Sequence, residues 1–345
     1  MRKKGYFERV KEQTPTRFWI NNVTREEAKL AIEAGATGCT QNPAYTWKML
    51  CHEDGRAHAK ERIEGYLGKG LDTTDIQVRV QRDLVGEIAK IFMPLYESSR
   101  GEAGFVSIQG DPFHEDAETM IRHACFNHEA GPNVMAKIPV TEEGLKAIEY
   151  VAARGIPINA TEVMAVRQAL DVCEIYEKAT KGMKNRAPIY FSHITGIYDE
   201  YLKKEAQARA VDISPDALWQ AGMAVARKTY HMTKRKNKAV GFIGGGARGL
   251  HHFTEMVGAD ACITINWKGT AEELLKQDPP VVERFFTPVP DGVIEELCAK
   301  LPDFRKGYFV DGIRPSEYED FGPVKLFRTS FEEAWENTRR YIESL

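Results

Sequence analysis

The sequence predicts an α/β fold, a (β/α)8 barrel with extra helices and a C-terminal helical tail. Short apolar runs alternate with longer amphipathic stretches eight times, and the connections are long enough for the helices that parallel strands require. The 345 residues show no compositionally distinct second part. We therefore expect one domain over residues 1–345, with the barrel core at about 16–275 and the helical extension at about 276–345. A doubly wound open sheet is the alternative.

Eight runs rich in β-branched or aromatic residues are the predicted strands. They are Phe18–Asn22, Ala36–Thr40, Phe105–Gln109, Val134–Pro139, Ile156–Thr161, Ile189–Thr195, Ala239–Gly244 and Ala261–Asn266. Amphipathic patterns predict helices between them, for example Arg25–Ala34 after a capping Thr24 and Glu142–Arg154 after a capping Thr141.

Two connections are longer than one helix requires. Ala44–Gly104 is predicted to hold several helices and Tyr198–Lys238 to hold two. After the eighth strand, helix is expected again at Val293–Lys300 and at Ser330–Leu345. Aromatic residues of the last segment would let it dock on the barrel or over its mouth.

Charge and composition exclude several kinds of partner. The 47 basic and 50 acidic residues give a formal charge of −3, which favours neither nucleic acid nor an anionic membrane. No segment approaches the roughly 18 apolar residues of a membrane helix. The six cysteines lack paired spacing, and the candidate site described below is poor in clustered His, Asp and Glu. We expect a cytoplasmic protein, monomeric or homo-oligomeric, without metal or cofactor.

Lys137 is the most informative residue for function. It lies inside the apolar strand Val134–Pro139, whereas a buried ammonium costs several kcal/mol unless it is paired or deprotonated. Desolvation lowers the pKa of a lysine and so favours the free amine that can attack a carbonyl. The alternative is a lysine that reaches the strand end or pairs with a carboxylate.

Neutral polar residues accompany Lys137 at the ends of the other predicted strands, where barrel enzymes carry their reactive groups. They are Asn21, Thr40, Asn42, Gln109, Asn159, Thr161 and Ser192. Asn159 and Thr161 are two residues apart on one strand, so both side chains are expected to point into the barrel. Amides and hydroxyls beside a neutral amine can bind substrate hydroxyls and orient a water.

These residues lie in stretches that resemble transaldolases. The opening of that family is similar to Phe18–Arg25 and Gly38–Pro43, and its Schiff-base strand is similar to Asn133–Gly144, the most diagnostic stretch. Its next strand and its eighth strand are similar to Gly155–Thr161 and Gly258–Ile265. The motifs follow the family's order over about residues 18–267.

The resemblance implies a class I aldolase mechanism. Lys137 would condense with a ketose carbonyl, C–C cleavage would release an aldehyde, and the retained three-carbon enamine would attack a new aldehyde. Asn42 and Asn159 match residues that hold donor hydroxyls, with Thr40 and Ser192 beside them, and Thr161 matches the residue that positions a water. The implied substrates are small ketoses and aldehydes that carry a negative charge.

Two catalytic positions depart from the family. Asn21 stands where transaldolases carry the aspartate that moves the proton during C–C cleavage, and an amide has no useful basicity. Gln109 stands where they carry glutamate, although the fructose-6-phosphate aldolase branch has glutamine there. Candidate substitutes for the lost base are His193, Glu162, Asp111 and Tyr198.

An anion site is expected after the seventh strand. The glycine-rich turn Gly244–Gly249 can bring backbone N–H groups to an anion at the start of a helix, and Arg248 can hold two anion oxygens. The resemblance places Gly246 and Arg248 at the family's phosphate position. The family's second arginine is replaced by Ile197, which predicts an altered distal group on the substrate.

Three hypotheses remain open at this point. The first is an active lysine-dependent transaldolase or aldolase with altered substrate range. The second is another Schiff-base lyase or a dehydratase that acts on a sugar-derived substrate. The third is a catalytically impaired binding protein, which the loss of the aspartate and the arginine would explain.

Overall fold

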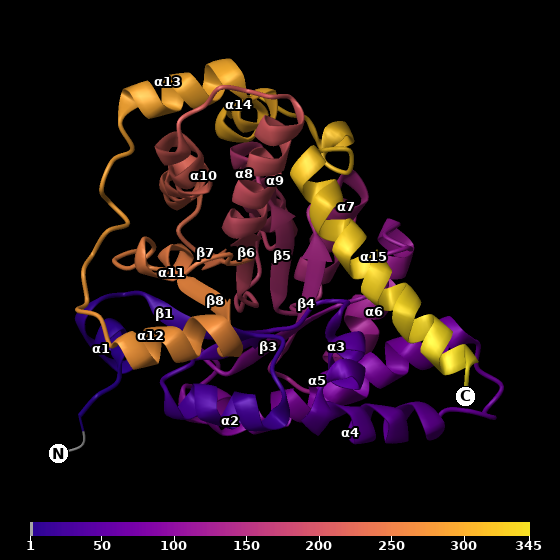
Figure 1. Ribbon diagram of the computed structural model, residues 1–345. Coiled ribbons are helices and arrows are strands. Elements are labelled where there is room, and N and C mark those ends of the chain that lie inside the picture. The colour runs from indigo at the N-terminus through magenta and orange to yellow at the C-terminus, as the bar shows by residue number, and fades with distance from the viewer. Residues whose placement is uncertain (1–2) are drawn as a thin grey trace.

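The computed structural model describes residues 3–345 and contains a closed barrel of eight parallel strands in sequence order, surrounded by helices (Figure 1). The strands are β1 (Arg17–Asn21), β2 (Gly38–Thr40), β3 (Phe105–Gln109), β4 (Val134–Pro139), β5 (Ile158–Val163), β6 (Ile189–His193), β7 (Val240–Gly244) and β8 (Cys262–Asn266). Pairing of β1 with β8 closes the barrel. The predicted fold class is confirmed.

The predicted strands match the observed ones closely, and the largest difference is at β5. This strand ends at Val163, two residues later than predicted, because its pairing with β6 shifts register between Ala160 and Val163. Glu162 lies within this irregularity and has a left-handed backbone, with φ of 62°. That conformation is uncommon for a non-glycine residue and redirects its side chain.

The helices follow the predicted pattern of crossovers. They are α1 (Tyr6–Gln13), α2 (Arg25–Glu33), α3 (Tyr45–Cys51), α4 (Glu53–Glu64), α5 (Thr73–Ser98), α6 (Ala117–His128), α7 (Glu142–Ala153), α8 (Val166–Ala179), α9 (Thr195–Ala208), α10 (Pro215–Lys236), α11 (His251–Thr254), α12 (Glu272–Gln277), α13 (Asp291–Lys300), α14 (Pro302–Tyr308) and α15 (Gly322–Glu343). Short helical turns η1 (Trp267–Ala271) and η2 (Pro315–Glu317) complete them. The predicted caps Thr24 and Thr141 accept backbone N–H bonds from Glu27 and Gly144. Within residues 3–345, no helix is both long and apolar enough to cross a bilayer.

The inside of the barrel changes from apolar to polar along the strands. Trp19, Phe105, Met135 and Ile243, each from a different strand, form a separate apolar cluster. Two residues further along their strands stand Asn21, Ser107 and Lys137, which share the inward face because side chains alternate along a strand. The polar layer therefore lies at the carboxyl ends, where barrel enzymes bind their substrates.

The C-terminal segment packs across the barrel rather than away from it. Helix α15 begins eight residues before the predicted Ser330 and runs diagonally over the molecule, in yellow in Figure 1. It contacts α3, α5, α9 and β5. Phe331 and Trp335 are buried, and the backbone carbonyl of Trp335 accepts a hydrogen bond from Gln77 on α5. The predicted docking of this helix is thus observed.

Candidate active site

Lys137 is buried at the carboxyl end of the barrel, with 7% of its surface exposed. Its Nζ donates to the backbone carbonyl of Gln41 at 3.3 Å, and no carboxylate of residues 3–345 lies within ion-pair distance of it. Burial lowers the pKa of Lys137 to about 8, while the nearby charge of Glu162 acts in the opposite direction. A substantial fraction of the amine is therefore neutral near physiological pH.

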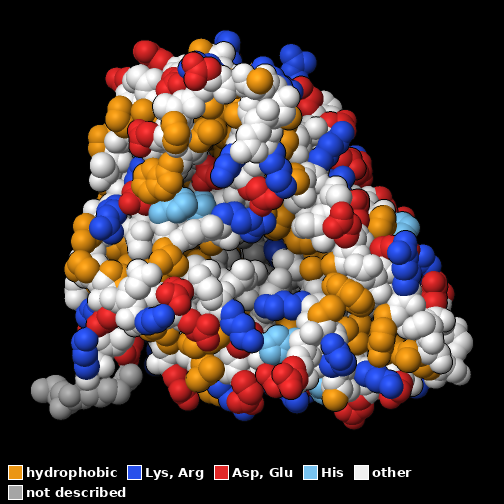
Figure 2. Space-filling model, in the orientation of Figure 1, with side chains coloured by type: hydrophobic (Ala, Val, Ile, Leu, Met, Phe, Trp, Pro, Cys, Tyr) orange, Lys and Arg blue, Asp and Glu red, His pale blue; other side chains and the backbone are white. Residues whose placement is uncertain are grey.

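Lys137 lines a cavity of about 440 Å³ at the mouth of the barrel. Figure 2 shows the hollow in this face, and both of its opposite edges carry Lys or Arg side chains as well as histidine. Seven of the ten predicted site residues line the cavity: Lys137, Asn21, Thr40, Asn42, Ser192, Gly246 and Arg248. Phe327, Ser330 and Phe331 of α15 form part of its wall, which sequence reasoning assigned only loosely.

A chain of hydrogen bonds orders the polar groups of β1, β2 and β8. Thr40 Oγ1 bonds Asn21 Oδ1 at 2.9 Å and Thr264 Oγ1 at 2.8 Å, and Asn21 Nδ2 donates to Asn266 Oδ1 at 3.0 Å. Because a hydroxyl has one hydrogen, Thr40 donates to Asn21 and accepts from Thr264. Asn21 is thus held by two neutral partners and carries no charge into the cavity.

A second polar layer lies beneath the cavity. Asn159 Nδ2 donates to Ser107 Oγ at 3.1 Å, and Ser192 Oγ donates to Asn159 Oδ1 at 2.7 Å. Asn159 and Thr161 are fully buried and do not line the large cavity. The hydroxyl of Thr161 has no hydrogen-bond partner in the protein, which is unusual for a buried polar atom.

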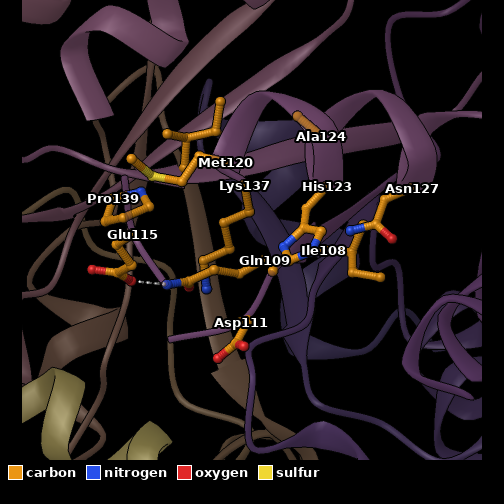
Figure 3. Close-up of a pocket in the computed structure, with 12 residues that line it drawn as sticks. Ile108, Gln109, Asp111, Glu115, Met120, His123, Ala124, Asn127, Lys137 and Pro139 are labelled. Atoms are coloured by element: carbon orange, nitrogen blue, oxygen red, sulfur yellow. Dashed lines mark hydrogen bonds between the residues drawn. The ribbon is translucent and has the colours of Figure 1, made fainter. Parts of the chain in front are cut away.

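Lys137 also lines a second, smaller cavity, whose lining residues are drawn in Figure 3. Its volume is about 10 Å³, at the lower limit for one water molecule. Its polar lining includes Lys137, Gln109, Asp111 and Glu115. Gln109 therefore lies next to Lys137, as predicted, but at this small cavity rather than at the mouth.

Glu162 lies beside Lys137 in a buried group of charges. Gln109 Nε2 donates to Glu162 Oε1 at 3.0 Å, while Glu162 Oε2 has no hydrogen-bond partner. Arg328 of α15 pairs with Glu115 at 3.0 Å. Burial raises the pKa of Glu162, and the positive charges of Arg328 and Lys137 oppose that rise. Burial likewise holds the pKa of Glu115 well above its usual range.

The other proposed substitutes for the lost base are engaged elsewhere. Asp111 accepts from the Phe113 N–H and bonds the ring of His114. His193 bonds Thr195, and burial lowers its pKa to about 3, so it is neutral. The Tyr198 hydroxyl donates to a backbone carbonyl, and burial raises its pKa. Among these four, only the charge of Glu162 acts on Lys137.

The glycine-rich turn differs from expectation in two respects. It leads into α11, a helix of only four residues, so it has no substantial helix dipole behind it. Arg248, half exposed, is paired through Nε with Glu200 of α9 at 2.6 Å rather than free for a ligand. Ile197 is buried, and a Cβ at Gly246 would lie 3.0 Å from its Cγ1. An arginine at position 197 would therefore disturb this packing.

A cluster of Asp199, His251 and His252 beside this turn brings possible metal ligands within 4.8 Å of one another. However, the Arg248 N–H donates to His252 Nδ1, so the proton on Nε2 of that ring is donated to Asp199 at 2.8 Å. Asp199 also accepts from the Gly222 N–H. These bonds give His252 a structural role in holding the turn against α9.

Sequence reasoning missed several residues of the site. Lys48 left a weak signal, a lysine among apolar residues of a helix that follows a strand. His52 and Lys268 gave no signal, because each reaches the mouth only through tertiary packing, and the same holds for Arg328 beside Glu115. Glu115 was missed for the same reason.

A closed parallel barrel with a buried lysine at a cavity on the carboxyl ends of its strands has the architecture of a barrel enzyme. The profile of the transaldolase/fructose-6-phosphate aldolase family matches residues 18–296. The chain belongs to this family.

Individual relatives are distant. A transaldolase of Trichodesmium erythraeum is 30% identical over 209 residues, which is 54% of this chain and 54% of the relative. A transaldolase of Saccharopolyspora erythraea is 30% identical over 167 residues, 46% of this chain and 44% of the relative. A transaldolase of Mycobacterium leprae is 28% identical over 235 residues, which is 61% of this chain and 60% of the relative. The alignments thus span between 44% and 60% of these relatives.

Proposed function

We propose that this protein uses Lys137 to transfer or release a three-carbon ketol unit from a ketose or sugar phosphate, with a substrate range altered from that of other transaldolases. The observation that carries the proposal is the position of Lys137, a buried amine between two cavities, without a carboxylate partner within residues 3–345. The names of the relatives, all transaldolases, support the same chemistry.

In the proposed first steps, the neutral Lys137 amine attacks the ketose carbonyl and loss of water gives a Schiff base. As the β-hydroxyl loses its proton, the bond between the α and β carbons breaks, which releases an aldehyde and leaves a three-carbon enamine on the lysine. The enamine either attacks an acceptor aldehyde or takes a proton, and water then hydrolyses the Schiff base. Asn42 and Ser192, which line the mouth cavity, supply hydrogen bonds for the donor hydroxyls.

Glu162 is the group we assign to proton transfer in this chain. A base must accept the hydroxyl proton as the C–C bond breaks, and Asn21 cannot do so because an amide is not basic. Glu162 has an oxygen without a protein partner, and its bond to Gln109 orients the carboxyl group beside Lys137. Its raised pKa, caused by burial, suits a group that must both accept and return a proton.

Reductive trapping tests the Schiff base. The purified protein is treated with borohydride in the presence of dihydroxyacetone or a ketose, and the modified residue is located by peptide mass spectrometry. We expect the adduct on Lys137 and none in the Lys137→Met variant. Lys48 is a matched internal control, because burial lowers its pKa too but it lies on α3 rather than in the barrel. An unmodified Lys137 would contradict the proposal.

Product analysis separates the transferase reaction from other Schiff-base chemistry. The enzyme is incubated with a ketose donor, with and without an aldehyde acceptor, and the products are followed by NMR. A new ketose that contains the donor's three carbons indicates transfer, and free dihydroxyacetone indicates release. An unsaturated or dehydrated product would instead favour a lyase or a dehydratase.

A further inference from the structure

Three basic side chains gather on one edge of the mouth cavity: Lys48, His52 and Lys268, which we call the cationic rim. They lie on α3, directly after α3 and in η1, beyond the carboxyl ends of β2 and β8. These strands flank β1 in the closed barrel, so the cationic rim is a continuous part of the mouth. The glycine-rich turn, which follows β7, lines the same cavity.

Two groups of the cationic rim face each other as hydrogen-bond donors. His52 Nδ1 accepts the Asp54 N–H at 3.3 Å, so the ring carries its hydrogen on Nε2. That Nε2 lies 3.4 Å from Lys268 Nζ, which has only hydrogens to offer. Two donors cannot satisfy each other, whereas an oxygen of an anion placed between them accepts from both.

The charges of the cavity are also unbalanced. Four Lys and Arg residues line it, and Glu27 is the one acid among the described lining residues. Glu27 accepts from the Thr24 N–H at the start of α2. The Lys48 ammonium donates one hydrogen bond to the Asn22 backbone carbonyl, which leaves two of its three hydrogens available for a ligand. Within residues 3–345, neither Lys48 nor Lys268 has a carboxylate within 4.0 Å.

The two lysines act on each other as like charges. The pKa of Lys48 is lowered mainly by burial, and the positive charge of Lys268 lowers it further, although Glu27 acts in the opposite direction. An anion at the cationic rim would relieve this repulsion and gain charge-assisted hydrogen bonds. Arg248 differs, since Glu200 already neutralises it.

We propose that the cationic rim binds the anionic end group, a phosphate or a carboxylate, of the substrate whose carbonyl reacts with Lys137. This assignment rests on the proposed function for the identity of the substrate, but the anion site itself can be tested without turnover. It places the charged end of the substrate on the β8–β1–β2 side of the mouth, whereas the glycine-rich turn with Arg248 lies on the β7 side.

Anion titration tests the site directly. Binding of inorganic phosphate, and separately of acetate, is measured by calorimetry for the full-length protein and for the variants Lys268→Gln, His52→Gln and Arg248→Gln. Lys276→Gln is the matched control, because it removes the same charge from an exposed position on nearby α12. We expect Lys268→Gln to raise the Kd for the bound anion at least tenfold, His52→Gln several-fold and the other two less than threefold.

The two anions separate the possible end groups. Tighter binding of phosphate that depends on Lys268 indicates a phosphate ester, and comparable binding of acetate indicates a carboxylate. Loss of binding in Arg248→Gln, with Lys268→Gln unchanged, would overturn the assignment in favour of the glycine-rich turn. Absence of binding by the unaltered protein would overturn it as well.

Steady-state kinetics connect the site to substrate. With a phosphorylated ketose donor, Lys268→Gln is expected to raise KM about tenfold, and with the unphosphorylated ketose to leave it within twofold. Borohydride trapping on Lys137 is measured in parallel. If trapping fails but phosphate binding still depends on Lys268, the proposed chemistry is refuted and the anion site stands. If trapping is normal but phosphate binding does not depend on Lys268, the anion site alone is refuted.

Discussion

Lys137 separates two cavities that differ in size and in chemistry. The cavity at the mouth, about 440 Å³, offers Lys137 the neutral amides and hydroxyls of Asn21, Thr40 and Ser192. The one behind it, about 10 Å³, is lined by Gln109 and the carboxyl groups of Asp111 and Glu115. Glu27 is the one acid among the described residues that line the mouth, whereas two carboxyl groups line the small cavity.

This difference suggests that substrate binding and proton transfer take place on different sides of Lys137. At the mouth, the amide and hydroxyls of Asn21, Thr40 and Ser192 can orient a bound ketose, and their hydrogen bonds do not depend on ionisation. In the proposed mechanism, proton transfer is assigned to the acidic side, where Gln109 connects Glu162 with Glu115. The four predictions that follow test this division, in order of decreasing expected effect.

Replacing the amine removes the group that both cavities share. Lys137→Met is expected to lower turnover by at least about 10³-fold, because the proposed covalent intermediate forms on this amine. The folded variant should be more stable by about 3 kcal/mol at pH 7, since burial lowers the pKa of Lys137 from 10.5 to about 8.

The sign of this stability difference can be checked by denaturant unfolding at several pH values. The lowered pKa penalises the charged form, so the penalty is fully present below pH 8 and disappears as the pH rises towards 10.5. The stability gain of Lys137→Met should shrink over the same range. A variant that is inactive and less stable would point to misfolding instead.

Glu162→Gln removes the proton-transfer group from the acidic side while it keeps an oxygen for the Gln109 amide. We expect turnover to fall about 10²-fold, within the usual range for general acid–base catalysis. Borohydride trapping of dihydroxyacetone on Lys137 should persist. Glu115→Gln is the matched control, with a smaller loss, because its carboxyl group acts on Lys137 less directly. Equal losses in both variants would refute the assignment.

The rate of trapping on Lys137 should depend on pH through the amine itself. Because its pKa is about 8, the neutral fraction rises from about 1% at pH 6 to about 50% at pH 8, so the rate should rise roughly fifty-fold. The titratable groups that act on Lys137 are Glu162 and Cys39, and burial keeps Cys39 a thiol in this range. A flat profile over pH 6–8 would mean that the amine is not desolvated.

The smallest effect is expected from Asn21→Asp, which restores the acid found in transaldolases. If proton transfer has moved to Glu162, turnover should change by less than about threefold. The new carboxylate can still accept from Thr40, and a flipped Asn266 amide can donate to it. A large gain in turnover would show that the mouth of the cavity, not the acidic side, limits the reaction.

The fold could be predicted from the sequence because each strand carries its own signal. Val134–Pro139 was predicted with the correct ends, since an apolar run bounded by turn residues and a capped helix leaves little choice. The end of β5 was misplaced because a register shift depends on pairing with β6, which local sequence does not encode.

The candidate site was predictable only where it is carried by the strands themselves. Lys137 and Asn21 could be found as polar residues in apolar runs at fixed positions. Arg328 and Lys268 could not, because their proximity to Lys137 arises from how α15 and η1 pack on the finished barrel. The pairing of Arg248 with Glu200 was also invisible, since neither residue alone indicates its partner.

The position of α15 has a consequence for biosynthesis. This helix follows all eight strands in the chain, yet Phe327 and Phe331 wall the mouth cavity and Arg328 faces the buried carboxyl groups. A nascent chain that has already closed its barrel therefore holds an unwalled Lys137 and an uncompensated pair of acids. The wall of the cavity that Lys137 lines is completed only when translation has passed residue 331.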